Sequence, residues 1–373
     1  MSFKNIWYLI LKEIKSVISD IPLVGLVIVV FTVAVYSVSK GVTTEVKNAS
    51  IAIIDNDHSS LSYKIRDSFL PPQFKQSKVI SYSERDALMD QGKFVFVVDI
   101  PPNFQKDLLA GSKPQIQLLI DATAATVAGL GGVYVQRIIT NEILDFLNVD
   151  TSVMNPFFEP VIHTLFNQNQ DTVWFIGVTQ VLGNVTLLVM ILVGAAIIRE
   201  REHGTIEHLL VMPVKASEIA LSKIITNGGM IMIAAMLSMF FVVHLLLEVP
   251  INGSVPLFFV GLIVYVYTMA SLALWLSTLA PTLPQFGLLC IPIYIVSRLL
   301  SGLETPLESM SPIIQKVSHL SPVTQFSIFS QAVLFRDAGI DVVWPQIVIL
   351  TIMGTSFFIF ALSKFRSMLA RQG

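Results

Sequence analysis

The stretch 173-VWFIGVTQVLGNVTLLVMILVGAAII-198 contains no Asp, Glu, Lys or Arg, and the four charges of 199-RERE-202 follow it at once. A bilayer core about 30 Å thick is crossed by roughly 20 predominantly apolar residues in an α-helix. The stretch therefore predicts a membrane-spanning helix that ends abruptly in charge.

The rest of the chain has the composition of a protein with several such helices. Of its 373 residues 53% are hydrophobic and only 13% are charged, with a mean hydropathy of +0.71, whereas soluble domains carry about 25% charged residues. We predict an α-helical polytopic membrane protein with six transmembrane helices, the first over residues 21–39 and the others within 172–373. The five further apolar runs are Ile21–Val38, Ile219–Leu247, Val255–Leu279, Pro284–Leu300 and Val342–Leu362.

Basic residues in the short flanks of these runs predict the orientation. They gather before the first run, between the second and third, and after the last. Short cytoplasmic segments are enriched in Lys and Arg, and an even number of spans places all three clusters on one side. We therefore expect both termini in the cytoplasm and residues 40–171 outside it. The basic residues are Lys4, Lys12, Lys15, Arg199, Arg201, Lys215, Lys223, Lys364, Arg366 and Arg371.

Residues 1–20 predict an amphipathic helix on the cytoplasmic side of the membrane. At 100° per residue their apolar side chains share one face and the lysines share another. Such a helix is expected to lie in the membrane interface, with Trp7 among the lipid headgroups. Packing against the helix bundle is an alternative that fits the pattern nearly as well. The apolar face comprises Phe3, Ile6, Trp7, Ile10, Ile14, Val17 and Ile18.

Residues 40–171 alternate between β-rich runs and polar helical stretches, which predicts an inserted α/β domain. Asp121 is a candidate N-cap for a longer helix that continues to about Leu147. The expected strands are Ala49–Ile54, Lys78–Ser81, Phe94–Val98 and Ile116–Ile120, and the expected shorter helices are Ser59–Phe69, Ser83–Gln91 and Asn103–Ala110.

The segment Arg199–Pro213 has the signals of a short helix outside the membrane. Gly204 can end the transmembrane helix, Thr205 can cap a new one, and Pro213 can stop it. Glu207 in the first turn is favoured by the helix dipole. Ile206, Leu209 and Leu210 form an apolar stripe, which suits a groove on a partner protein. A solvated turn that only neutralises the helix end is the alternative.

Two groups of potential metal ligands carry weaker signals. Asp55, Asp57 and His58 follow an expected strand, where such residues usually bond the local backbone. His203 and His208 flank Glu207, but their spacing matches neither H-E-x-x-H nor H-x-x-E-H. The single cysteine, Cys290, excludes an intrachain disulfide and a cysteine-rich metal site. We expect no metal site in this chain.

Two motifs resemble the ABC-2 type transporter permeases. The first is the run of Arg199 to Pro213, RERE-HGTIEHLLVMP, continued by Val214 to Ile219. The second is SGLETP from Ser301, with Met310-Ser311-Pro312 and His319-Leu320-Ser321-Pro322, which looks like an outer re-entrant region over 301–325. The large domain after the first helix is similar to bacterial exporter permeases that work with periplasmic adaptors. The resemblance covers nearly the whole chain and is strongest from Val173 onward.

This resemblance implies how the protein works and with what partners. It implies an inner-membrane permease that pairs with a second permease subunit, identical or paralogous, and two cytoplasmic ABC ATPase domains. The ATPase would clamp Arg199–Pro213 and thereby open a path outward. The chain has no G-x-x-x-x-G-K-[ST] motif, since Gly92-Lys93 lacks the upstream glycine. We therefore expect it to bind no cofactor itself, with ATP and Mg²⁺ on the ATPase, and a periplasmic adaptor is a further candidate partner.

Polar residues inside the spans are candidates for a cargo pathway, because burying them against lipid is unfavourable. The alternative is that they bond across helices. Arg298 is expected to snorkel or to pair with Glu304. Few charges in the spans suggest a hydrophobic or amphipathic cargo, such as a drug. The candidates are Gln180, Asn184, Thr186, Asn227 and Arg298.

Two other classes of function compete with transport. A membrane-anchored sensor or scaffold would use its exported domain to bind a partner protein. An intramembrane enzyme would need a catalytic set, and the sequence offers no convincing one. The net charge of -2 gives no overall basic excess that would indicate nucleic acid.

Overall fold

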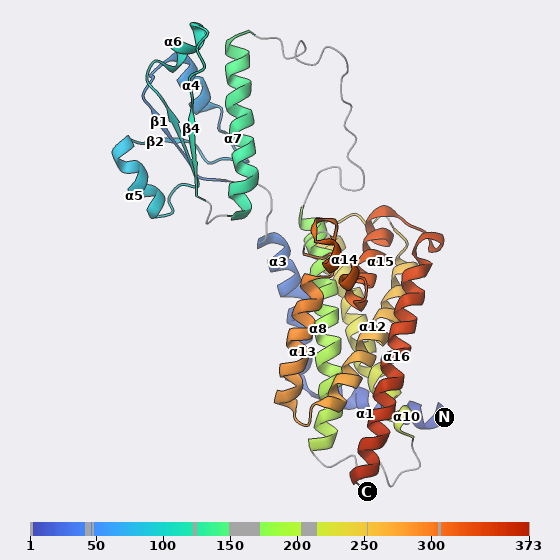
Figure 1. Ribbon diagram of the computed structural model, residues 1–373. Helices are drawn as coiled ribbons and strands as arrows, with labels where there is room; N and C mark the ends of the chain where they lie inside the picture. The colour runs from blue at the N-terminus through green and yellow to red at the C-terminus, as the bar shows by residue number, and fades with distance from the viewer. Residues whose placement is uncertain are drawn as a thin grey trace. The chain divides into compact units, whose positions relative to one another are not determined.

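The computed structural model describes residues 3–41, 46, 48–121, 125–148, 172–202, 215–251, 253–304 and 307–372. The chain divides into two compact units, one of residues 1–42 and 165–373, the other of residues 43–164. The first is a helix bundle and the second is an α/β unit (Figure 1).

Five helices of the bundle are long and apolar enough to cross a membrane. They agree with five of the six predicted spans. α13 (Leu283–Leu299) has 17 residues and covers about 26 Å at 1.5 Å per residue, less than a 30 Å bilayer core. The sixth span therefore stays a prediction. The five are Ile21–Gly41 (α2 Ile21–Val29, η1 Val30–Ala34, α3 Val35–Gly41), α8 (Thr172–Glu202), Ala216–Leu246 (α10 Ala216–Lys223, η4 Ile224–Gly228, α11 Gly229–Leu237, η5 Ser238–Leu246), α12 (Val255–Leu279) and Ile340–Lys364 within α16 (Ile340–Gln372).

α8 is the central helix of the bundle. In its most apolar window 89% of the residues are buried, against 17% in the first and the last long helix. It packs against α3, α12 and α13. Gly194 permits the close approach of α13, because a Cβ there would lie 2.0 Å from the Phe286 ring. Residues 173–198 therefore form the centre of the helix bundle.

Two of the described spans, the first and the third, contain π-helical turns, which leave carbonyls available to other helices. In η1 the carbonyl of Val30 accepts a bond from Asn184 Nδ2 at 2.9 Å. The next carbonyl, Phe31, accepts one from Ser238 Oγ in η5. Backbone groups inside a membrane must be satisfied within the protein, so these bonds join the first span to the second and third.

At the end of the bundle opposite both termini, a group of shorter helices follows α13 (Figure 1). η6 (Leu307–Ser309) and α14 (Pro312–Ser318) lie within the predicted re-entrant region. The boundary at residue 325 was wrong, because α15 (Pro322–Arg336) continues to Arg336. α15 is largely buried against α12 and α16. Its sequence therefore lacks a clear polar face, and the end of the helix could not be predicted from it.

The α/β unit contains one four-stranded sheet in the order β2-β1-β3-β4. β1 is parallel to β2 and to β3, whereas β3 and β4 are antiparallel. All four strands were predicted to within a few residues. The elements are β1 (Ile51–Asp55), α4 (Ser60–Asp67), β2 (Lys78–Val79), η2 (Tyr82–Glu84), α5 (Arg85–Asp90), β3 (Phe96–Ile100), α6 (Phe104–Leu109), β4 (Gln117–Ile120) and α7 (Ala125–Phe146).

Helices cover both faces of this sheet. On one face Ile53 and Phe96 pack with Leu61 of α4 and Val135 of α7. On the other face Ile54 and Val97 pack with Leu88 and Met89 of α5. The alternation of side chains along β1 and β3 produces both cores.

Asp121 joins the end of the sheet. Its backbone N–H donates to the Val95 carbonyl at 2.9 Å, so this residue extends the pairing of β4 with β3. α7 is described from Ala125, and residues 122–124 lie outside the described part of the chain. The N-cap role of Asp121 therefore stays a prediction.

Candidate functional site at the end of α8

The helix α1 (Phe3–Ser19) lies at the end of the bundle where α8 terminates (Figure 1). Its Leu9, Ile10 and Val17 are buried, and it packs against α10 and η4. Trp7 is 53% exposed and lies on the apolar face predicted for the membrane interface. The helix predicted from the sequence therefore exists, and it also packs against the bundle.

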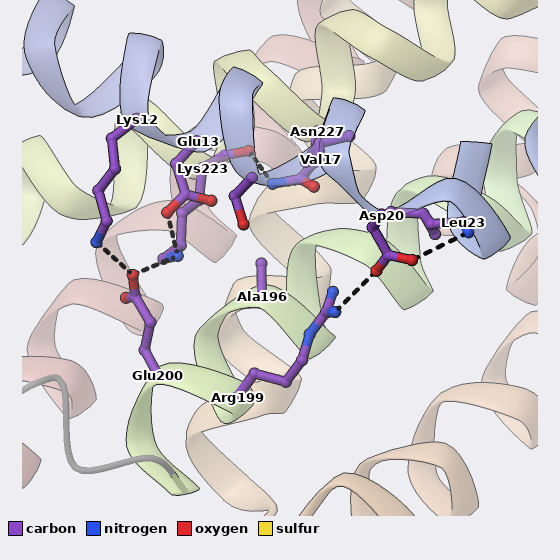
Figure 2. A pocket seen from close by; sticks show the side chains of 11 residues that line it. Lys12, Glu13, Val17, Asp20, Leu23, Ala196, Arg199, Glu200, Lys223 and Asn227 are labelled. Atoms are coloured by element: carbon purple, nitrogen blue, oxygen red, sulfur yellow. Dashed lines mark hydrogen bonds and ion pairs between the residues drawn. The ribbon is translucent and has the colours of Figure 1, made fainter.

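Arg199, the first charged residue of α8, contacts the joint between α1 and α2. Its Nη1 lies 3.6 Å from Asp20 Oδ2. Asp20 also caps α2, since its Oδ1 accepts from the backbone N–H of Leu23 at 3.2 Å. Figure 2 shows Asp20 between these two partners. A single carboxylate thus fixes the start of the first span and the end of the second.

Glu200 belongs to a buried network of ion pairs (Figure 2). Its Oε1 lies 3.0 Å from Lys223 Nζ of α10 and 3.6 Å from Lys12 Nζ of α1. Lys223 Nζ also lies 3.0 Å from Glu13 Oε1, and the Lys223 side chain is only 2% exposed. Removing one member of such a network would leave a buried charge without its counter-ion.

The last two residues of α8 contact the turn between α12 and α13. Arg201 donates to the Ser277 carbonyl at 3.5 Å and to the Ala280 carbonyl, both at the end of α12. Glu202 Oε1 accepts from the backbone N–H of Leu283 at 3.0 Å, at the start of α13. A cation at a helix C-terminus and an anion at a helix N-terminus complement the two helix dipoles.

The sequence RERE therefore fastens the end of α8 to α1, α2, α10, α12 and α13. Successive residues of an α-helix point about 100° apart, so four consecutive charges reach four directions around the helix. Gly204, Thr205, Ile206, Glu207, Leu209, Leu210 and Pro213, which we predicted to contact an ATPase, lie outside the described residues. The helix predicted over them stays a prediction.

A pocket of about 350 Å³ lies among these charges. Asn227 lines it and donates to the Lys223 carbonyl at 3.1 Å. Its three cationic residues have counterparts in three acidic ones, so the charges of the lining cancel. The pocket therefore does not present a net charge that would attract a free ion. The charged residues are Lys12, Arg199 and Lys223 with Glu13, Asp20 and Glu200.

A second polar group is centred on Arg298 of α13. Its Nε donates to Glu304 Oε1 at 2.8 Å, which confirms the predicted pair. Its Nη1 donates to Tyr294 OH at 2.9 Å and its Nη2 to Gln180 Oε1 of α8 at 3.1 Å. Gly183 leaves room for the guanidinium, because a Cβ there would lie 3.0 Å from Nη1.

The predicted pathway residues fall in three places. Gln180 donates to Asn184 at 3.1 Å, and both belong to the group around Arg298. Thr186 is 2.5 Å from Tyr265 OH in the buried centre of the bundle. Asn227 lies in the charged pocket. Asn184, Thr186 and Arg298 bond to other helices, whereas the bond of Asn227 stays within its own span. A cargo pathway along these residues stays a prediction.

The turn after β1 binds its own backbone and a neighbouring helix. Asp55 Oδ1 accepts from the N–H groups of Asp57 and His58, at 3.1 and 2.9 Å. Asp57 Oδ2 accepts from Gln105 N of α6, and Gln105 Oε1 accepts from Leu61 N of α4. Within the described part of the chain no three His, Cys, Asp or Glu residues are placed to hold a metal ion. Asp57 thus caps the start of α6, whereas Asp55 orders the turn before α4, whose N-cap is Ser59.

Sequence reasoning missed Glu13, Lys223, Tyr265 and Tyr294. Glu13 and Lys223 were ordinary charges near the ends of apolar runs, and the two tyrosines were counted as apolar. The signal that could have identified Glu13 and Lys223 was a charged residue within a helix whose other residues pack on the bundle. Pairing across 210 positions of sequence could not be found from one chain alone.

Comparisons with known proteins show to which family this chain belongs. A family model described as "ABC-2 family transporter protein" matches residues 19–363. The inner membrane transport permease YhhJ of Escherichia coli is 40% identical over 363 residues, which are 97% of each chain. The chain belongs to the ABC-2 transporter family. A more distant ABC-2 relative, the probable multidrug ABC transporter permease YbhR of E. coli, is 26% identical over 95% of this chain and 98% of its own.

Membership of the ABC-2 family identifies the chain as a membrane-embedded transport permease, a kind of subunit that is not itself catalytic. It implies an ABC ATPase and a second permease subunit as partners. For an ABC-2 permease, the end of α8 is the place where charge, burial and inter-helix contacts concentrate within the described residues.

Proposed function

We propose that this ABC-2 permease is the transmembrane subunit of an exporter, driven by a cytoplasmic ABC ATPase. The observation that carries this is the fastening of α8 by Arg199, Glu200, Arg201 and Glu202. These residues are the first four of the segment Arg199–Pro213, which resembles the ATPase-contacting region of the family. A displacement of that segment would therefore reach five other helices of the bundle, α1, α2, α10, α12 and α13, through short polar contacts.

The transmitted movement would follow the contacts in order. A push on the end of α8 acts on α10 and α1 through Glu200 and Lys223, which lie 3.0 Å apart. It acts on the α12–α13 turn through Arg201 and Glu202. Separating the members of a buried charged pair is strongly destabilising. The network would therefore shift these helices together.

Orientation and location follow from the charges and from the relatives. The basic end of the bundle, with both termini, would face the cytoplasm. Residues 40–171, including the α/β unit, would then lie outside, with α13 as a sixth span. The named relative is an inner membrane permease, and we assign this chain to the inner membrane of a bacterium.

The cargo we propose is hydrophobic or amphipathic, in the manner of drug efflux. YbhR is named as a probable multidrug permease. Arg298, in the last turn of α13, is already bonded to Glu304, Tyr294 and Gln180. A bundle with so few charges offers little to a small ion. The α/β unit would bind a periplasmic adaptor, and the permease would act as a dimer with an identical or paralogous copy.

Recovery of the ATPase tests the partnership. The tagged chain, solubilised from membranes of its own organism, is expected to bring with it an ABC ATPase. Glu207→Lys and Leu209→Pro, which alter the predicted helix, should lose at least about tenfold of that ATPase, since an interface loses tenfold in affinity for each 1.4 kcal/mol. Asp90→Lys on the exposed end of α5 is the control for charge reversal. Equal recovery with all three variants would contradict the proposal.

A further inference from the structure

An apolar groove lies on the side of α1 away from the charged pocket. It has a volume of about 290 Å³ and is walled by Ile10, Ile14 and Ile18 of α1 together with Gly229, Met230 and Ile233 of the third span. Ile18 and Ile233 are 66% and 60% exposed, so the groove is open on the outer surface of the bundle. In a membrane protein such a surface faces lipid.

Charge is distributed unevenly around α1. The pocket on one side contains as many acidic as basic residues. Beside the groove, Lys15 lies about 60° and Lys4 about 40° around the helix from Ile18, at 100° per residue. Both lysines are exposed, and neither forms an ion pair with a residue that the structure describes. The groove is therefore apolar inside and cationic along one edge.

The wall of the groove has incomplete hydrogen bonding. Thr226 lies in the π-helical turn η4, and its buried hydroxyl has no partner among the described residues. A threonine in a regular helix usually bonds the carbonyl four residues back, as Thr268 does in α12. π-turns occur frequently at functional sites. The backbone and hydrogen bonding of this wall therefore differ from those of a regular α-helical span.

We propose that the groove binds one acyl chain of an anionic membrane phospholipid, whose phosphate lies against Lys15, while Lys4, about 16 Å further along the same edge of α1, adds positive charge to that edge. An amphipathic helix in the interface places its apolar face at the level where acyl chains begin and its lysines at the level of the phosphates. A lipid satisfies both halves of this arrangement. The bound lipid would wedge between α1 and α11 and hold α1 in the position where Glu13 meets Lys223.

Native mass spectrometry of the full chain, released from nanodiscs, tests this site. One set of nanodiscs contains phosphatidylglycerol and the other phosphatidylcholine. Wild-type protein is expected to retain phosphatidylglycerol at least fivefold more than phosphatidylcholine. Lys4→Gln with Lys15→Gln should bring that ratio to about one. Equal retention of both lipids by the wild type would overturn the proposal.

Filling the groove provides the second arm. Gly229→Leu should lose the retained phosphatidylglycerol at least fivefold, because an added Cβ there meets no atom within 4 Å and the longer side chain can occupy the groove without a clash. Gly287→Leu in α13, where a Cβ also meets nothing within 4 Å, is the matched control and should retain the lipid. Retention by Gly229→Leu at the wild-type level would overturn the site. Recovery of a non-lipid molecule that Gly229→Leu displaces would overturn the choice of ligand.

Discussion

The ammonium of Lys223 in α10 lies 3.0 Å from the carboxylate of Glu13 in α1 and the same distance from Glu200 at the end of α8. The Lys223 side chain is 2% exposed, so water contributes little to its solvation. One lysine thus joins an amphipathic helix, the second span and the third span. The contact lies directly before the segment that resembles the ATPase-contacting helix of ABC-2 permeases.

The buried lysine should be far more important for stability than its exposed neighbour. Lys223→Met leaves Glu13 and Glu200 without their shared counter-ion, and breaking a buried pair costs about 3–5 kcal/mol. Lys12 lies 3.6 Å from the same Glu200 but is 56% exposed, and such pairs contribute about 0–1 kcal/mol. Thermal unfolding in detergent should therefore show a large drop for Lys223→Met and little change for Lys12→Met. Equal drops would contradict the burial argument.

Substitutions of Gly183 and Arg298 should not be additive in their effect on stability. Gly183→Leu would displace the guanidinium, because even a Cβ lies 3.0 Å from its Nη1. Losing charge-assisted bonds to Gln180 and Tyr294 is expected to cost about 2 kcal/mol. Arg298→Met should cost a similar amount, and the double variant little more. Gly25→Leu, where a Cβ meets nothing within 4 Å, is the control. Additive effects of Gly183→Leu and Arg298→Met on the free energy of unfolding would show that the two residues act separately.

α7 should loosen from the sheet when Gly131 gains a side chain. A Cβ at Gly131 would lie 2.3 Å from Phe96 Cζ in the core of the α/β unit. Overpacking of this kind costs about 1–3 kcal/mol. Limited proteolysis of the full chain should cleave Gly131→Ala faster between 121 and 148 than wild type. Gly132→Ala meets only the flexible end of Ile120 at 3.0 Å and should resist cleavage as wild type does; equal sensitivity of the two variants would argue against the predicted clash.

Cysteine labelling should decide whether α13 crosses the membrane. Cys290→Ala removes the one native cysteine, after which Thr282→Cys and Ile313→Cys are introduced separately, both at exposed positions on either side of α13. An impermeant maleimide added to spheroplasts should label Ile313→Cys and leave Thr282→Cys unlabelled. After the membrane is permeabilised both should react. Absence of labelling at both positions in intact spheroplasts would show that α13 does not cross and would leave the bundle with five spans.

The membrane-spanning helices could be predicted from the sequence because a helix that crosses a membrane must be long and apolar. The run before Arg199 has both, and the structure describes its helix through Glu202. The strands of the α/β unit were also visible, since β1 and β3 are short apolar runs between turns. The extent of α15 was not, because a short buried helix lacks the length of a span and the polarity of a loop.

The site was only half visible from the sequence. Arg199 to Glu202 were recognisable as charges at the end of a span, but their partners depend on how distant helices pack. Glu13 and Lys223 lie 210 positions apart, and no local pattern joins them. The pair of Arg298 and Glu304 was predicted because six positions separate them, whereas Gln180, 118 positions from Arg298, was assigned to the pathway by its polarity alone.

The most direct test of coupling through the end of α8 is ATP-dependent uptake of lipophilic dyes into everted membrane vesicles containing the permease with its ATPase. Glu202→Ala, which removes the acceptor for Leu283 N, and Leu209→Pro should each lower dye uptake per ATP hydrolysed at least about tenfold, equivalent to 1.4 kcal/mol of coupling. Asp90→Lys should match wild type. Wild-type uptake per ATP in both altered proteins would contradict the account.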